Sequence, residues 1–223
     1  MDILHGFGPL LLEGALVTVQ LALLALVIGT AIGGICCWLQ FSSWRVLRAV
    51  GFTYVSVVRG IPDLLVVFAV YFGGSMLLAT LFDRYVEVNA FAAGAFALAL
   101  SFGAFVAEIM RGALLSVHKG QSEAAFSLGL TPLQSLLLVR LPQAARMAVA
   151  PFGNQAIVLL KQTSIVSIVG CNELMRNAAE ASGATREPFT MYMAVACIYL
   201  VLTGCTALIL GYAENRAERS MAR

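Results

Sequence analysis

The chain has 223 residues, of which 60% are hydrophobic and only 12% are charged, and its mean hydropathy is +0.89. This composition excludes an ordinary soluble domain and predicts an integral membrane protein. The small net charge of +2, carried by unclustered basic residues, argues against nucleic-acid binding.

Five apolar runs are long enough for a helix to cross about 30 Å of hydrocarbon, which takes roughly 20 residues. They cover approximately residues 9–39, 52–82, 89–115, 148–170 and 189–212. We therefore expect an all-α integral membrane protein with five transmembrane helices, built as a single domain over residues 1–223.

The Lys and Arg residues are divided unequally between the two sides that these runs define. Nine of the fourteen follow the first, third or fifth run or lie at the inner end of the third, three lie in the opposite loops, and Arg59 and Lys161 lie within or beside apolar runs. Basic residues concentrate on the cytoplasmic side of membrane proteins. The distribution predicts an N-terminus outside, a C-terminus inside, and a cytoplasmic segment over about 116–142.

Ionisable residues interrupt the second and third runs. In Arg59-Gly60-Ile61-Pro62-Asp63, Gly and Pro end one helix, and Pro62 and Asp63 suit the first turn of the next. Asp63 either stabilises only that helix terminus or lines a solute route, as ionisable groups at broken transporter helices do. Glu108 either pairs with Arg111 at i, i+3 or attracts a cationic solute.

The polar stretch EAAFSLGLTPLQSLLLVRLP, residues 123–142, separates the third and fourth runs. Ser122 and Glu123 suit the start of a short helix, because both satisfy the positive helix N-terminus. Gly129 suits a left-handed stop after it. The first half of the stretch is therefore predicted to be a short helix that ends in a turn.

A second short helix is predicted after this turn. Thr131 and Gln134 have the spacing of a capping box, and Pro132 fits the first helical position between them. Pro142 is expected to break the chain at the far end. The complete stretch is then a helix-turn-helix between membrane segments.

The fourth run is interrupted at Pro151 and again at Lys161-Gln162-Thr163-Ser164. A lone Lys within a membrane helix costs about 2.5–3.5 kcal/mol, so it requires a partner, water or a function. Thr163 and Ser164 either bond back to the preceding turn and bend the helix or, with Lys161, hold a solute carboxylate. Lys161 would then face that carboxylate or pair with Asp63 or Glu108.

The polar stretch resembles the cytoplasmic coupling loop of permeases of ATP-binding-cassette (ABC) importers. The matching positions are Glu123, Ala124, Ala125, Gly129, Val139, Leu141 and Pro142, with Val139 where isoleucine is more usual. The segments GALVTVQLALLALVIG, RGIPD, GQSEAA and LLKQTSIVS extend the resemblance to the polar amino acid uptake branch. The Asp63 that follows Pro62 resembles the pattern of the subgroup that carries basic amino acids and opines (histidine, lysine, arginine, ornithine, octopine and nopaline).

The resemblance implies a type I ABC importer permease fold in a bacterial inner membrane, with alternating access driven by a partner ATPase. Residues 116–142 would be the coupling loop, and its ATPase contacts would be made by Glu123, Ala124, Ala125, Gly129, Leu141 and Pro142. The substrate pathway would include Asp63, Glu108, Lys161, Thr163 and Ser164. ATP and Mg would bind the ATPase, with no cofactor on this chain.

The resemblance also implies a set of partners. These are a second permease subunit, paralogous in this subgroup and so forming a heterodimer, two ATPase subunits, and a periplasmic solute-binding protein. Residues 171–188 carry mixed charges and suit either a docking surface for the binding protein or a solvated connection.

The sequence holds no catalytic or metal-binding pattern that would indicate an enzyme. A Gly-x-x-x-x-Gly-Lys-Ser/Thr loop, a His-Glu-x-x-His motif, a Gly-x-Ser-x-Gly motif and metal-spaced cysteines are all missing. We therefore expect a non-catalytic membrane subunit. The alternative is a secondary transporter or channel subunit that uses an ion gradient, which would favour paired repeats with matched broken helices.

Overall fold

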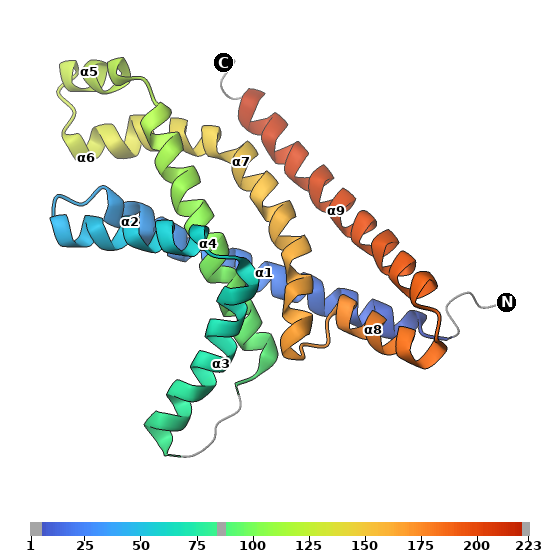
Figure 1. The fold of residues 1–223 in the computed structure, drawn as a ribbon. Helices are drawn as coiled ribbons and strands as arrows, with labels where there is room; N and C mark the ends of the chain where they lie inside the picture. Colours follow the sequence, from blue (N-terminus) through green and yellow to red (C-terminus); the bar gives the residue numbers. More distant parts are fainter. Residues whose placement is uncertain (1–5, 84–87, 220–223) are drawn as a thin grey trace.

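The computed structural model describes residues 6–83 and 88–219, and this part of the chain is built from helices (Figure 1). Within it, four helices are long and apolar enough to cross a membrane: α1 (Gly8–Gln40), α3 (Asp63–Phe82), α4 (Ala90–Ser116) and α9 (Pro188–Arg219, of which Pro188–Tyr212 qualifies). These agree with the first, third and fifth expected runs and with most of the second.

The fourth span is a bent assembly instead of one straight helix. It consists of α6 (Pro132–Gln134), a π-helical turn η1 (Ser135–Arg140), α7 (Leu141–Gln162) and a 3₁₀ segment η2 (Thr163–Val169). The following helix, α8 (Leu174–Thr185), leaves it at an angle of 53°. When these elements are counted together as one span, the described residues have five candidate spans, and this one is the fourth in chain order.

The predicted helix breaks at Pro142 and Pro151 are wrong. Leu141 has helical torsions (φ −63°, ψ −43°), Pro142 lies in the first turn of α7, and α7 continues through Pro151. The wider π-helical turn before Pro142 offers a physical reason, because π bulges relax the normal i to i−4 hydrogen-bond ladder into which a proline cannot donate.

The expected second run of residues 52–82 is wrong at its start. Residues 52–60 belong to a separate amphipathic helix, α2 (Arg45–Gly60), and the break at Ile61 and Pro62 leaves α3 as the membrane span. Gly51 and Val55 of α2 are buried. Cys36 Sγ and Gln40 Nε2 of α1 both donate to the Gly51 carbonyl oxygen, each at 3.3 Å, which holds α1 and α2 together as a hairpin.

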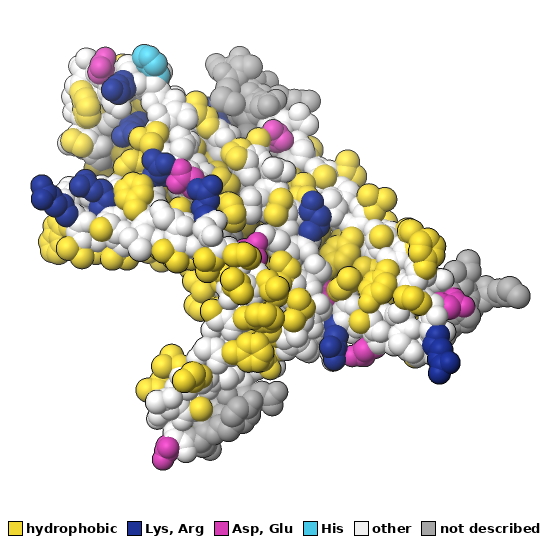
Figure 2. Space-filling model, in the orientation of Figure 1, with side chains coloured by type: hydrophobic (Ala, Val, Ile, Leu, Met, Phe, Trp, Pro, Cys, Tyr) yellow, Lys and Arg dark blue, Asp and Glu magenta, His cyan; other side chains and the backbone are white. Residues whose placement is uncertain are grey.

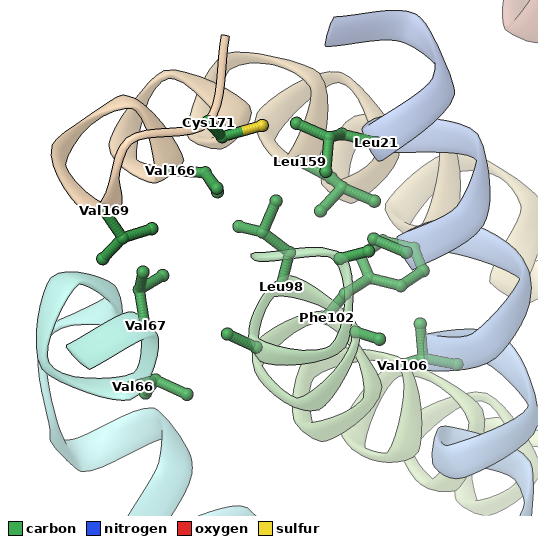
Figure 3. Packing of buried hydrophobic residues seen from close by; sticks show 14 residues of the cluster. Leu21, Val66, Val67, Leu98, Phe102, Val106, Leu159, Val166, Val169 and Cys171 are labelled. Carbon is green, nitrogen blue, oxygen red and sulfur yellow. The ribbon is translucent and has the colours of Figure 1, made fainter. Parts of the chain in front are cut away.

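The core is centred on α4, which is the most buried of the four single-helix spans. Figure 3 shows Leu98 of α4 between Val166 of η2 and Leu21 of α1, with Phe102 of α4 beside α1. Close approach of α1 requires glycine, since a Cβ atom at Gly33 would lie 2.7 Å from Val106 Cβ. Gly33 therefore lets α1 pack closely against α4.

A short helix, α5 (Lys119–Ser127), projects beyond the bundle and returns through α6 and η1 (Figure 1). It lies at the same end as the C-terminal end of α9 and opposite α8. On the face shown in Figure 2, Lys and Arg side chains gather over α2 and over this projecting end.

Candidate functional site

The projecting segment begins with α5, which starts earlier than expected. His118, and not Ser122, is the N-cap residue: its Nδ1 accepts a hydrogen bond from the Gly120 amide at 3.1 Å. Glu123 and Ala124 are exposed, whereas Ala125 is only 2% exposed, on a helix that packs against η1. Of these three residues, Glu123 and Ala124 therefore offer a surface to a partner, and Ala125 fixes the helix to the segment behind it.

The turn after α5 is built as the sequence predicts. Gly129 has φ +78°, in the left-handed region, and its amide donates to the Phe126 carbonyl oxygen at 2.9 Å. The capping box is also confirmed, because the Thr131 hydroxyl accepts from the Gln134 amide and the Gln134 side chain accepts from the Thr131 amide. These local interactions give the segment a defined shape outside the bundle.

Two polar contacts connect this segment to the spans. Gln143 of α7 donates from Nε2 to Gln121 Oε1 of α5 at 3.1 Å, and Arg140 donates from Nη2 to the Leu114 carbonyl oxygen of α4 at 3.3 Å. Leu141 and Pro142 are exposed at the start of α7. These contacts connect α5 to α7 and η1 to α4.

The second candidate region is a polar junction formed by Asp63 and Gln162. Asp63 is the first residue of α3, and Gln162 is the last residue of α7, where the helix changes to 3₁₀ geometry. Gln162 Nε2 donates to Asp63 Oδ2 at 2.5 Å. Two helix breaks that are 99 residues apart in sequence therefore meet, and they place a carboxylate at the positive end of a helix within the bundle.

Glu108 lies on α4 and forms the expected i, i+3 ion pair. Arg111 Nη2 lies 2.5 Å from Glu108 Oε1, and both side chains are partly exposed. Arg111 also lies over the Phe52 ring at 5.8 Å, and Arg59 lies over the Phe105 ring, one turn from Glu108, at 5.2 Å. Among the residues that the structure describes, Arg111 is therefore the cation that contacts Glu108 directly.

The hydroxyl groups after Gln162 bond back along the chain. Thr163 is buried and donates to the Leu160 carbonyl oxygen at 2.8 Å, and Ser164 donates to the Lys161 carbonyl oxygen at 2.9 Å. This is the arrangement expected if these residues bend the helix. Lys161 is exposed, and within the described residues it forms no ion pair with Asp63 or Glu108.

Two residues of these regions were not singled out from the sequence. Gln162 is the partner of Asp63, and no spacing rule connects positions so far apart. Glu173, expected among the solvated charges of residues 171–188, is instead fully buried. Its side chain accepts from the Arg176 amide and caps α8, and an acidic residue directly before a helix was the available signal.

Residues 25–219 match the model of a family described as "Binding-protein-dependent transport system inner membrane component". The nopaline transport system permease protein NocQ of Agrobacterium fabrum is 38% identical, over 97% of this chain and 94% of the relative. The arginine ABC transporter permease protein ArtQ of Escherichia coli is 36% identical, over 97% of this chain and 98% of the relative. The similarity thus extends over nearly the whole of each protein.

Solved structures agree in fold. A chain of a crystal structure of an amino acid ABC transporter with histidines superposes with a TM-score of 0.88 and 34% sequence identity, covering 97% of this chain and 99% of that one. A chain of the MetNI methionine ABC transporter in an inward-facing conformation has a TM-score of 0.73 at 20% identity. The latter supports the architecture alone.

Proposed function

Because the chain belongs to the family of binding-protein-dependent transport system inner membrane components, we propose that it is the permease subunit of an ABC importer for basic amino acids. Its homologues are permease subunits of amino acid ABC transporters. The observation that carries the proposal is the polar junction, where the Asp63 carboxylate lies at a break between two helices. Broken helices with ionisable groups are typical of solute sites in transporters.

In the proposed pathway, Asp63 attracts the guanidinium or ammonium group of the solute. A substrate cation would compete with Gln162 for this carboxylate, and the charge-assisted interaction favours the cation. Glu108 would contribute a second negative charge when Arg111 turns away. Lys161, Thr163 and Ser164 would lie at the carboxylate end of the solute, which requires the turns after Gln162 to open their internal hydrogen bonds.

Transport is proposed to follow alternating access driven from the coupling loop, residues 116–142. A partner ATPase would contact the exposed face of α5 at Glu123 and Ala124, with Gly129 setting the turn and Leu141 and Pro142 continuing the contact. ATP and Mg would be bound by that ATPase. Ala125 supports the same contact from inside, because it joins α5 to the segment that enters the membrane.

The proposed assembly contains a paralogous second permease subunit, two ATPase subunits and a periplasmic binding protein in a bacterial inner membrane. Residues 171–188 would face the binding protein. The proposed topology has the N-terminus outside and the C-terminus inside, and it is supported by the position of the coupling loop and the C-terminal end of α9 at one end of the bundle (Figure 1).

Uptake by reconstituted vesicles tests this function. The purified complex and its binding protein are incorporated with ATP inside the vesicles, and uptake of labelled arginine is measured against glutamine. We expect uptake to require both ATP and the ATPase. Uptake that persists without the ATPase and responds to an ion gradient would instead establish the secondary-transporter alternative.

Labelling in intact cells tests the topology separately. We expect a cysteine placed at His118 to be protected from a membrane-impermeant maleimide, and one placed at Gly183, exposed on α8, to react. The reverse pattern would overturn the proposed orientation.

A further inference from the structure

An apolar hollow lies at the coupling-loop end, between α1, α4 and the η1–α7 segment. Its volume is about 380 Å³, which is within the range of about 300–1,000 Å³ found for small-molecule sites. Its walls consist of apolar or small side chains, among them Trp38, Phe41, Met110, Leu136 and Ala144. An occupant must therefore be mostly apolar.

The lining includes one charged residue, Arg140. Its guanidinium has five N–H donors, of which Nη2 supplies one to the Leu114 carbonyl oxygen. Within residues 6–83 and 88–219, no carboxylate lies within ion-pair distance of it. The hollow thus combines an apolar interior with an arginine whose charge is not neutralised.

The position of the hollow matches the membrane–water interface. α1 has 33 residues, and at about 1.5 Å per residue it is longer than the hydrocarbon core, so its C-terminal end reaches the headgroup region. The two Trp residues of the chain, Trp38 and Trp44, lie at this end and are 68% and 74% exposed. Exposed Trp is typical of the interface, and exposed Arg45 and Arg48 follow directly.

We propose that this hollow binds one acidic phospholipid, with an acyl chain against Trp38 and Phe41 and the phosphate on Arg140. The charge of Arg140 and the basic start of α2 complement an anionic headgroup, and the apolar walls complement the chain. The bound lipid would connect the α1–α2 hairpin to the segment that leaves the coupling loop. The inference depends on the proposed function only for naming this leaflet the inner one.

The test measures lipid retained by the purified complex. The complex is incorporated into phosphatidylcholine vesicles that contain phosphatidylglycerol, extracted in mild detergent and examined by native mass spectrometry. We expect retained phosphatidylglycerol, at least tenfold in excess of phosphatidylcholine after correction for vesicle composition. Equal retention of the two lipids, or retention of neither, would overturn the proposal.

Two variants remove the site by independent means. Gly34 lines the hollow, and an added Cβ atom there meets nothing within 4 Å, so Gly34→Leu has room for its Cβ atom and adds an apolar side chain at the hollow. Arg140→Gln removes the charge. Each is expected to reduce retained phosphatidylglycerol at least tenfold.

The matched controls are Gly73→Leu and Arg176→Gln. Gly73 also has open space around its Cβ position, and Arg176 is exposed on α8, while neither lines the hollow. Both controls should retain lipid as the unmodified complex does. Unchanged lipid retention in Gly34→Leu would refute the site. A Phe41→Cys variant that crosslinks to a second permease chain, in place of lipid, would also refute it. Neither result would affect the amino acid uptake measurements.

Discussion

Asp63 combines a fixed position with a negative charge that no cation in the described residues neutralises. Pro62 and the start of α3 fix its backbone, and Gln162 fixes the carboxylate by a hydrogen bond. An amide donor holds the carboxylate in place and leaves its net charge unchanged. Under the proposed function, this charge would distinguish cationic from neutral solutes.

Replacing Asp63 with Asn tests the charge separately from the structure, because the Asn side chain can still accept from Gln162. We expect the KM for arginine uptake to rise about tenfold, which corresponds to about 1.4 kcal/mol, with little change for glutamine. Competition between labelled arginine and unlabelled glutamine in vesicles measures the change in discrimination.

Asp83→Asn is the matched control for this experiment. Asp83 is exposed at the other end of α3 with φ +51°, a conformation that Asn also tolerates. The Asp83→Asn variant should take up both arginine and glutamine normally. A substrate profile that is the same for Asp63→Asn as for the unmodified protein would remove Asp63 from the pathway.

Contacts between neighbouring residues are the ones that the sequence predicts correctly. The Glu108–Arg111 pair and the Thr131–Gln134 capping box follow from helix geometry, so their spacing is sufficient. The contact of Asp63 with Gln162 depends on how α3 and α7 pack. Knowledge of each break separately does not reveal that the two breaks meet.

At the level of elements, the proposed coupling loop depends on one backbone conformation. Gly129 adopts φ +78°, and an added Cβ atom would meet nothing within 4 Å. The effect of a substitution there is therefore conformational and not steric. The direction in which α6 leaves α5 is the property that a side chain would alter.

Gly129→Val should uncouple transport from ATP hydrolysis. A β-branched residue is strained in the left-handed region by about 1–3 kcal/mol, so the turn is expected to change shape. We expect arginine uptake per ATP hydrolysed to fall at least fivefold at an unchanged level of protein in the membrane. Gly129→Asn, which tolerates this conformation, should keep most of the coupling, and equal coupling in Gly129→Val would contradict the proposed role of the turn.

Element boundaries are where the sequence predictions fail. Pro142 and Pro151 were expected to end helices, but each is accommodated, Pro142 in a first turn that follows a π-helical segment. A proline removes only one donor, so the outcome depends on the turn before it. The start of the second span was placed too early because Phe52 and its apolar neighbours belong to a helix with a polar face.

For the whole molecule, a buried polar network at the end opposite the coupling loop joins three helices. Glu173 Oε2 accepts from the Thr18 hydroxyl of α1 at 3.2 Å and from the Tyr199 hydroxyl of α9 at 3.3 Å. Thr18 Oγ1 in turn accepts from the Leu174 amide of α8 at 3.2 Å. The sequence shows Glu173 only as one charge in a polar segment, because its burial results from the packing of α1, α8 and α9.

The network predicts a large difference between two substitutions at Glu173. Glu173→Ala leaves the Thr18 and Tyr199 hydroxyls and the Arg176 amide without their acceptor, which costs roughly 1–3 kcal/mol for each buried group that stays unsatisfied. Glu173→Gln keeps one acceptor oxygen, so its cost should be smaller. Thermal unfolding of the purified complex should therefore give a clearly lower midpoint for Glu173→Ala than for Glu173→Gln. Glu180→Ala is the control, because it removes an exposed carboxylate from the same helix. The 3.3 Å ion pair of Glu180 with Arg176 is worth about 0–1 kcal/mol, so the midpoint should change little. Equal midpoints for all three variants would show that the network does not hold the helices together.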